Sequence, residues 1–322
     1  MSALNELLAP IAAEMKAVDL VIRECLDSDV VLIRTIGDYI IGSGGKRIRP
    51  AMVLLSAKAF GYKGGQHLKM AAVIEFIHTA TLLHDDVVDE SALRRGRSTA
   101  NEMFGNAASV LVGDYLYSRA FEMMVDVNRM AVMQVMSQAT KVISEGEVLQ
   151  LMNVNDPDVT QEKYLQVVRF KTAKLFEAAA RTGAILADAS QTLQEAAAAY
   201  GRHMGTAFQL IDDLLDYSGD PLTLGKTVGD DLREGKPTLP LLRVLEVGSA
   251  ADKAMIRQAI EHGDGDFEAV AQAIGRTDAL EHTRLASEAE VSLAIAALEV
   301  VPDSDTKTLL EQLAAHTLTR TH

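Results

Sequence analysis

Three aspartates fall within five positions in the segment LLHDDVVDE, residues 82–90: Asp85, Asp86 and Asp89. In a helix, positions i, i+1 and i+4 lie within an arc of about 100°, so these three carboxylates would share one side. Carboxylate oxygens bind hard cations, and Mg²⁺ typically takes one or two of them together with water and phosphate oxygens. The segment therefore predicts a divalent-cation site, although a single cluster of this kind is also typical of a solvated acidic helix end.

The same spacing recurs in QLIDDLLDY, residues 209–217, which contains Asp212, Asp213 and Asp216 behind a second apolar run. Unpaired carboxylates at the ends of two apolar helices would be costly unless positive charge meets them. Gln209 lies three residues before Asp212 and so shares its helix face, where it can hydrogen-bond metal-bound water or a phosphate oxygen. Two such clusters favour a metal–phosphate site over a solvated surface.

A basic, glycine-containing segment, GGKRIRP at residues 44–50, precedes both clusters. Its proline suits the first turn of a following helix, and a helix N-terminus beside Lys46, Arg47 and Arg49 can bind an anion. The segment lacks the spacing of a Walker A loop, and a basic loop of this kind taken alone is more often simply solvated. Other basic or polar residues near the clusters are Arg94, Arg95, Lys171, Thr172, Lys226 and Lys236.

Composition limits the class of protein that can position these groups. The chain has 322 residues, with 31 Lys+Arg against 45 Asp+Glu and a net charge of −14, which argues against a nucleic-acid binder. Its single cysteine, Cys25, cannot form an internal disulfide and fits a reducing compartment. The N-terminus has no secretory signal pattern, and no stretch of about 18 uncharged apolar residues predicts a membrane span. We expect a cytoplasmic protein.

Apolar residues recur at three- and four-residue spacing along the whole chain, as in EAEVSLAIAALEVV, residues 288–301, whereas convincing strand alternation is absent. Ambiguous runs such as SVLVGDYLYS, residues 109–118, are assigned as helix. The pattern predicts an all-α fold of ten or more helices in a single domain, residues 1–322. Breaks are expected at residues 41–50, 61–65, 153–160, 218–237, 261–266 and 301–306.

The combination of DDVVD followed by RR, a second DDLLD, GGKRIRP and GKTVGDDLREGKPTLP resembles the trans-isoprenyl diphosphate synthases. The resemblance covers residues from about 30 to 245, and it extends to the octaprenyl type through EFIHTATLLHDDVVDES and NAASVLVGDYLYSRAF. It implies an isoprenoid-synthase helical bundle around a central cavity, acting as a homodimer. Its implied reaction extends an allylic diphosphate, such as farnesyl diphosphate, by successive 1′-4 condensations with isopentenyl diphosphate. The implied product is a long all-trans polyprenyl diphosphate for quinone side chains.

The resemblance also assigns roles by position, with no departure in the motifs. Isopentenyl diphosphate would be held by Lys46, Arg49, His78 and Arg95, and the allylic diphosphate by Arg94, Lys171, Thr172, Gln209, Lys226 and Lys236. The Mg²⁺ ligands, for three ions, would be Asp85, Asp89, Asp212 and Asp216, with Asp86 and Asp213 completing the clusters and Lys171 beside them as a catalytic group.

Product length is partly readable from the residues before the first cluster. In the family, bulky residues four or five positions upstream stop the growing tail early, and here those positions are Thr81 and Ala80, which are both small, with Ile77 one turn further. A long product is therefore expected, and the eight-isoprene length rests on the resemblance. Release of such an apolar product could bring the protein into transient contact with a membrane.

Three alternatives compete with this interpretation. Adjacent His84 and Asp85 fit an HD-type metal phosphohydrolase, which leaves the second cluster unexplained. The Glu75-x-x-His78 spacing fits a di-iron bundle, which needs a second copy. The third alternative is a non-catalytic subunit of a heteromeric prenyl synthase. Such a subunit could lose its metal ligands during evolution, whereas both aspartate clusters are intact in this chain.

Overall fold

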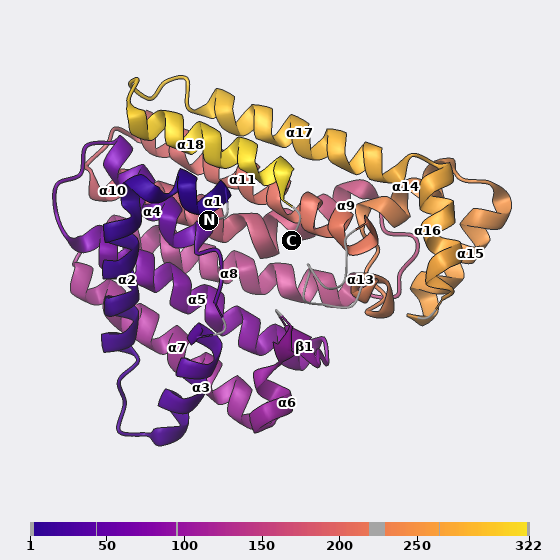
Figure 1. Ribbon diagram of the computed structural model, residues 1–322, viewed down its shortest axis with the longest axis horizontal. Coiled ribbons are helices and arrows are strands. Elements are labelled where there is room, and N and C mark those ends of the chain that lie inside the picture. The colour runs from indigo at the N-terminus through magenta and orange to yellow at the C-terminus, as the bar shows by residue number, and fades with distance from the viewer. Residues whose placement is uncertain (1–2, 43, 95, 219–228, 264, 321–322) are drawn as a thin grey trace. The chain divides into compact units, whose positions relative to one another are not determined.

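The computed structural model describes residues 3–42, 44–94, 96–218, 229–263 and 265–320 (Figure 1). Arg95 and Lys226, two of the residues with expected roles, lie outside this part of the chain. The described residues fall into two compact units, which we call the first unit (within Met1–Thr140, Leu175–Gly201 and Ala297–Leu313) and the second unit (within Lys141–Lys174, Arg202–Ala296 and Ala314–His322). The expectation of a single domain stays a prediction.

Helices make up nearly all of the regular structure among the described residues, which confirms the prediction of an all-α fold with ten or more helices. The elements up to the middle of the chain are α1 (Ala3–Leu7), η1 (Ala9–Ile11), α2 (Ala12–Cys25), α3 (Val31–Gly42), α4 (Ile48–Ala59), α5 (Gln66–Val88), β1 (Leu93–Arg94), β2 (Arg97–Ser98), α6 (Ala100–Phe104), α7 (Asn106–Val127) and α8 (Met130–Asn153). Those that follow are α9 (Gln161–Val167), η2 (Val168–Ala173), α10 (Lys174–Leu186), α11 (Gln191–Ser218), α13 (Asp230–Arg233), α14 (Leu239–Val247), α15 (Ala250–His262), α16 (Phe267–Arg276), α17 (Ala279–Ala297), α18 (Asp305–His316) and η3 (Thr317–Thr319).

Most expected breaks coincide with helix ends. The ambiguous segment 109–118 is helical within α7, as predicted. The expected break at residues 41–50 is shorter in the structure, because α3 extends to Gly42 and α4 begins at Ile48. The expected break at residues 218–237 includes the short helix α13. Two features were not foreseen: an antiparallel hairpin that pairs Leu93 with Ser98 and Arg94 with Arg97, and the π-helix η2.

Helix α5 is the central element of the first unit. Its residues from Met70 to Ile74, and again Phe76 and Ile77, are fully buried, because α5 packs against α2, α4 and α7. Gly113 lets α7 approach closely: a Cβ at this position would lie 2.3 Å from the His84 Nε2 atom. A helix covered on several sides is held rigidly, so its C-terminal turn is a firm base for functional side chains.

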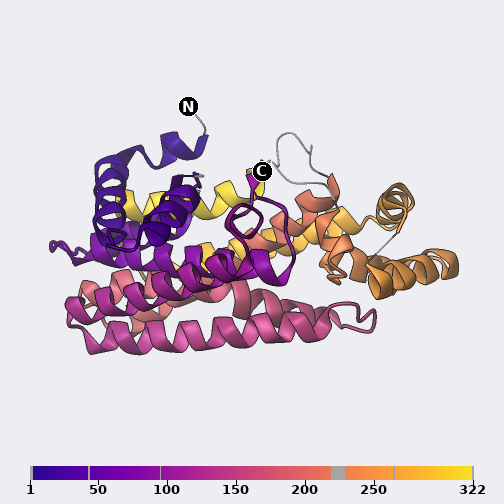
Figure 2. The same ribbon diagram turned by 90° about the horizontal axis from the view of Figure 1, so that it is seen from below.

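The second unit contains its own core. Helices α14, α15 and α16 pack around Leu241, Val244, Ile256, Ile260 and Val270, which are all fully buried, and the same three helices form a group in Figures 1 and 2. This core also includes Tyr217, directly after the second aspartate cluster, and Leu232 of α13.

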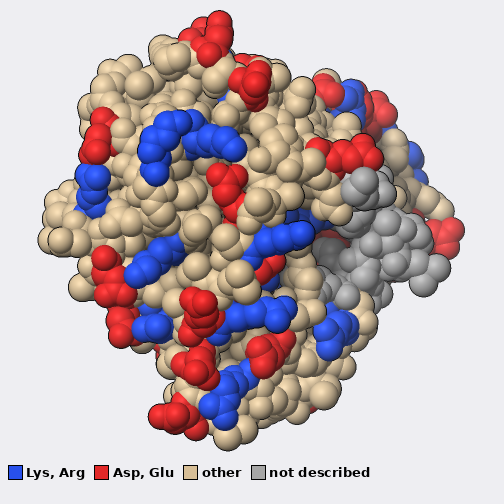
Figure 3. Space-filling view, turned by 60° about the vertical axis from the view of Figure 1, so that its left-hand side comes forward, with Lys and Arg blue, Asp and Glu red and all other residues tan. Residues whose placement is uncertain are grey.

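The surface agrees with a mixed, net acidic composition. On the face drawn in Figure 3, Lys and Arg side chains are scattered among Asp and Glu side chains. Over the described ranges, no helix has both the length and the apolar character needed to cross a membrane.

Candidate active site

The first aspartate cluster lies at the C-terminal end of α5. Asp85 and Asp86 belong to its last turn, and Asp89 is the C-cap, whose N–H donates to the Asp85 carbonyl at 2.8 Å. The helix ends because Glu90 adopts a left-handed φ of 51°, which lets the Ser91 N–H reach back to the Asp86 carbonyl at 3.0 Å. This is the Schellman arrangement, and it reverses the chain so that the hairpin returns toward the aspartates.

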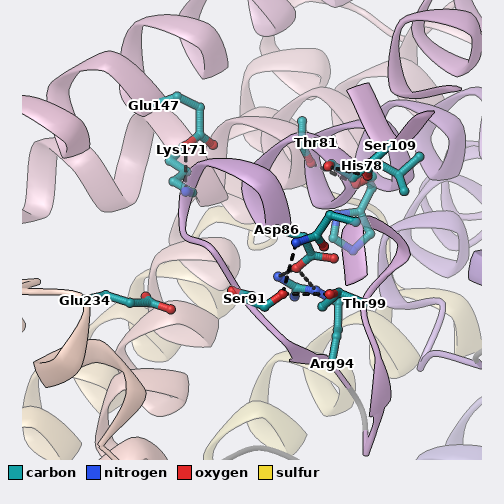
Figure 4. Close-up of polar contacts among 12 residues, drawn as sticks. His78, Thr81, Asp86, Ser91, Arg94, Thr99, Ser109, Glu147, Lys171 and Glu234 are labelled. Atoms are coloured by element: carbon teal, nitrogen blue, oxygen red, sulfur yellow. Dashed lines mark hydrogen bonds and ion pairs between the residues drawn. The ribbon is translucent and has the colours of Figure 1, made fainter. Parts of the chain in front are cut away.

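Asp86 and Arg94 form a close charged contact in this cluster. The Arg94 Nε and Nη2 atoms each lie 2.7 Å from Asp86 Oδ1, and the two side chains point toward each other in Figure 4. Asp86 is 1% exposed. Burial raises its pKa above the usual value, Arg94 opposes that rise, and the charges of Asp85 and Asp89 add to it. Asp86 is therefore a buried carboxylate that depends on its arginine, whereas Asp85 and Asp89 are only half-buried.

Arg49 and His78, two residues expected at the isopentenyl diphosphate site, are brought together in the first unit. The Arg49 Nη1 atom lies 3.1 Å from His78 Nε2, and its guanidinium stacks 4.3 Å from the centre of the buried Phe176 ring. A guanidinium can only donate, so His78 Nε2 accepts and the imidazole is neutral at this nitrogen. Lys46 is half-buried in the segment before α4.

Arg47, the remaining arginine of the basic segment, is directed elsewhere. It takes a left-handed φ of 51° as the N-cap of α4 and forms an ion pair with Glu75, which is 5% exposed. Lys46, Arg47 and Arg49 were expected to lie beside one anion site. Arg47 departs from this expectation, because its charge neutralises a buried carboxylate. The same ion pair occupies the Glu75 carboxylate, which the di-iron alternative would need as a metal ligand.

The positions expected to control product length lie on the buried part of α5. Ile77 and Ala80 are fully buried, whereas Thr81 is half-buried and its hydroxyl donates to the His78 carbonyl at 2.8 Å. The small Ala80 side chain leaves more room at this turn of the helix than a large residue would.

The second aspartate cluster lies near the C-terminal end of α11, in the second unit. Its three carboxylates have different surroundings: Asp212 is half-buried, whereas Asp213 is 2% exposed and Asp216 is fully buried. Asp216 Oδ2 accepts the backbone N–H of Asp231 at 3.1 Å, at the start of α13. Asp216 thus supplies a side-chain acceptor to a helix N-terminus that would otherwise carry an unpaired donor.

A chain of hydrogen bonds joins this cluster to the π-helix. The Thr172 hydroxyl donates to Gln209 Oε1 at 2.9 Å, Gln209 Nε2 donates to Asp213 Oδ1 at 2.7 Å, and the Tyr164 hydroxyl donates to Asp213 Oδ2. Burial raises the pKa of Asp213 well above its usual value, and the charge of Asp231 raises it further. The chain fixes the Asp213 carboxylate through neutral donors.

The π-helix η2 carries Lys171 and Thr172 together, and such insertions are frequent at functional sites. It packs closely on α8 because Gly146 has no side chain: a Cβ there would lie 2.6 Å from the Lys171 backbone nitrogen. The Lys171 Nζ atom lies 2.6 Å from Glu147 Oε2 (Figure 4), and Lys236 pairs with Glu234.

The donor set of both clusters fits a hard divalent cation, because it consists of carboxylate oxygens. Within the described residues, no group of three or more His, Cys, Asp or Glu side chains is placed to hold a metal ion. In a usual Mg²⁺ site, water and substrate phosphate oxygens complete the coordination. Asp85, Asp89 and Asp212 are the accessible carboxylates that fit this role.

Comparison with known proteins decides the family. The profile of the polyprenyl synthetase family matches residues 30–276. The chain belongs to this family. It is 56% identical to octaprenyl diphosphate synthase of Escherichia coli (strain K12), over 97% of this chain and 96% of the relative. It is 43% identical to an all-trans-nonaprenyl-diphosphate synthase of Rhodobacter capsulatus, over 98% of each chain.

Solved structures agree with the sequence comparison. The crystal structure of a polyprenyl synthase from Caulobacter crescentus CB15, complexed with calcium and isoprenyl diphosphate, superposes with a TM-score of 0.96 at 41% identity, covering 99% of this chain and 98% of that one. A decaprenyl diphosphate synthase from Rhodobacter capsulatus gives 0.93 at 42% identity, covering 99% of each chain. The chain therefore has the all-helical isoprenoid-synthase fold.

The family settles the reaction class. The chain is a trans-polyprenyl diphosphate synthase, which elongates an allylic diphosphate with isopentenyl diphosphate and depends on a divalent metal. This interpretation prevails over the phosphohydrolase and non-catalytic alternatives. His84, which suggested a phosphohydrolase, lies 3.2 Å from the Val110 carbonyl and 3.4 Å from Asp114.

Sequence reasoning missed several residues that contact the expected site. Tyr164 and Glu147 contact Asp213 and Lys171, and Arg320, from the C-terminal segment, contacts Asp212. None of them belongs to a motif with recognisable spacing, so only the fold reveals them.

Proposed function

We propose that this polyprenyl synthase makes octaprenyl (C40) diphosphate from farnesyl diphosphate and isopentenyl diphosphate, as a precursor of quinone side chains. The observation that carries this proposal is the 56% identity to the Escherichia coli octaprenyl diphosphate synthase over nearly the full length of both chains. The small side chain of Ala80 supports a long product, because no bulky residue stands at this turn of α5.

In this proposal the first unit binds isopentenyl diphosphate through Arg49 and His78, together with Lys46 and Arg95. Arg49 is held at a fixed angle by the ring of Phe176 and by His78, so its remaining N–H groups are oriented before substrate arrives. A planar guanidinium can bind a phosphate with two parallel hydrogen bonds, which positions the isopentenyl double bond for attack.

We propose that the two aspartate clusters act on the same allylic diphosphate. Its protein contacts would come from Arg94, Lys171, Thr172, Gln209, Lys226 and Lys236. Three Mg²⁺ ions would be held by Asp85, Asp89, Asp212 and Asp216, with Asp86 and Asp213 completing the two clusters. Bound Mg²⁺ would supply positive charge that stabilises the departing diphosphate.

The chain's own residues then have a limited chemical task. Arg94 and Lys171 offset the negative charge that develops as the allylic C–O bond breaks, which lowers the barrier when those charges are already in place. Buried apolar residues of α5, such as Ile77, exclude water from the tail and so protect the allylic cation from hydrolysis. The proton lost after condensation can pass to the diphosphate, so no dedicated protein base is required.

The direct test is to incubate the purified protein with Mg²⁺, farnesyl diphosphate and labelled isopentenyl diphosphate, followed by chromatography of the products. A single C40 product that disappears with EDTA is expected. A single product of another length would contradict the octaprenyl assignment alone, whereas no incorporation by a folded protein would contradict the synthase activity.

Product length should respond to Ala80. We expect Ala80→Val to shorten the product slightly and Ala80→Phe to shorten it more, because each side chain obstructs the turn before the first cluster. Overpacking a buried site costs about 1–3 kcal/mol, so thermal unfolding is measured beside the product analysis. Unchanged C40 product from folded Ala80→Phe would show that the tail does not pass this residue.

We further propose a cytoplasmic homodimer. Large apolar side chains are exposed on two long helices: Leu111 and Val125 on α7 are 66% and 63% exposed, and Leu151 and Met152 on α8 are 63% and 71% exposed. Burying such residues against a second copy would recover their hydrophobic free energy. Light scattering coupled to gel filtration tests the dimer, and a vesicle flotation assay with and without product tests transient membrane contact during release.

A further inference from the structure

Arg320, near the end of the chain, contacts the second aspartate cluster. Its Nη2 atom lies 2.8 Å from Asp212 Oδ1, and its guanidinium carbon lies 3.7 Å from the centre of the Phe208 ring. Phe208 and Asp212 are one turn apart on α11, so a single arginine spans two consecutive positions of one helix face. The Arg320 side chain is only 6% exposed.

The surroundings explain why a cation is stable there. Asp212, Asp213, Asp216 and Asp231 bring four carboxyl groups into one small region of the second unit, with Asp231 near enough to influence Asp213 electrostatically. Arginine stays charged at every accessible pH and is the residue best suited to a stacked, partly desolvated ion pair. Arg320 therefore offsets part of the negative charge of these carboxylates, which would otherwise repel one another.

The geometry favours a permanent contact between Arg320 and Asp212 over one that breaks when a metal ion binds. To break the contact, Arg320 would have to leave the Phe208 ring and move its charge to another environment each time a metal ion binds. The 310 turn η3 (Thr317–Thr319) leads directly into Arg320, and Thr317 is 2% exposed, which ties the segment to the unit. A side chain that is stacked, ion-paired and tethered loses little further freedom when it holds a neighbour in place.

We propose that Arg320 is a positioning residue for the metal-binding carboxylate of Asp212. It engages Oδ1 and fixes the orientation of the carboxylate, and Oδ2 is the oxygen that would hold a divalent cation. The inference rests on the proposed metal-binding role of Asp212. Groups that orient a metal ligand in this way commonly change metal affinity by 10–100-fold when removed.

The test measures binding without turnover. Labelled farnesyl diphosphate is equilibrated by dialysis with the full-length protein, in the absence of isopentenyl diphosphate, over a series of Mg²⁺ concentrations. Arg320→Gln should raise the Mg²⁺ concentration for half-maximal binding by about tenfold, and Arg320→Lys should recover part of that loss. Phe208→Leu, which keeps the charge but removes the ring, should give a smaller shift in the same direction.

A double-mutant cycle with Asp212→Asn separates positioning from direct action. If Arg320 acts through Asp212, the variant carrying both Arg320→Gln and Asp212→Asn should bind like Asp212→Asn alone, whereas independent effects would multiply and overturn the proposal. Arg284→Gln is the matched control, because Arg284 pairs with Glu281 and Glu288 on the outer face of α17 in the same unit, and it should cause no shift.

The remaining outcomes are also decisive. Unchanged Mg²⁺ dependence in folded Arg320→Gln would overturn the positioning role. Unchanged binding by Asp212→Asn would remove Asp212 from the metal site and the inference with it, while C40 synthesis by the unaltered protein would leave the proposed function standing. If thermal unfolding shows that Arg320→Gln does not fold, Arg320→Lys and Phe208→Leu still test the proposal. An unchanged Mg²⁺ dependence in both of these variants would contradict it.

Discussion

The two aspartate clusters have the same spacing but different surroundings. In the first, the buried Asp86 is neutralised by Arg94, which lies eight residues further along the chain in a hairpin. In the second, the buried Asp213 is bound by the neutral donors of Gln209 and Tyr164, and the charged partner, Arg320, contacts the more accessible Asp212 instead.

This difference shows that one sequence motif can have two electrostatic designs. Arg94 offsets part of the desolvation of the buried Asp86 with its charge, whereas the buried Asp213 has hydrogen bonds from neutral donors only. In both clusters, however, the first aspartate, Asp85 or Asp212, is half-buried, and we propose that it is a cation ligand.

The largest expected effect comes from these two accessible carboxylates. Asp85→Asn and Asp212→Asn should each slow condensation roughly 10²–10³-fold, the range for losing one group that stabilises charge developing in the transition state. Label incorporation from isopentenyl diphosphate measures the rate. Asp188→Asn, which alters an exposed carboxylate paired with Arg129, should leave it unchanged. A normal rate in Asp212→Asn alone would mean that the clusters do not share the reaction.

The next effect separates the two buried carboxylates by stability. Arg94→Gln should lower the free energy of unfolding by about 3 kcal/mol, because it leaves Asp86 buried without its charged partner. Asp213→Asn should cost less than about 1 kcal/mol, because its partners are neutral and an amide still offers one acceptor oxygen. Urea unfolding measures both. Equal losses would contradict the distinction between the two clusters.

The last effect concerns the packing of the π-helix η2 beside the second cluster. Gly146→Ala should cost about 1–3 kcal/mol, because the added Cβ would meet the Lys171 backbone and force η2 away from α8. Gly275→Ala in α16 is the control: nothing lies within 4 Å of its added Cβ, so stability should be unchanged or rise by up to about 1 kcal/mol. Circular dichroism during thermal unfolding compares the two variants, and equal stability would show that η2 tolerates displacement.

The sequence by itself determined the class of fold and the chemistry. Three- and four-residue periodicity is a local property of the chain, so the all-α architecture, the helical segment 109–118 and most helix breaks followed from it. The aspartate clusters and the segment GGKRIRP are also contiguous, and their chemistry is readable because the spacing within one helix fixes which side chains share a face. The proximity of Arg94 to Asp86 was implied by their short separation.

Only the tertiary structure decided which partners these groups have. Arg47 turned out to neutralise Glu75, Arg49 to stack on Phe176, and Arg320 to pair with Asp212, although each partner lies far away in the sequence. The π-helix η2 likewise depends on Gly146, a residue of another helix. Periodicity specifies which face of a helix is buried but not what covers it, and the identity of that covering residue sets the charge, the hydrogen bonding and the pKa at the site.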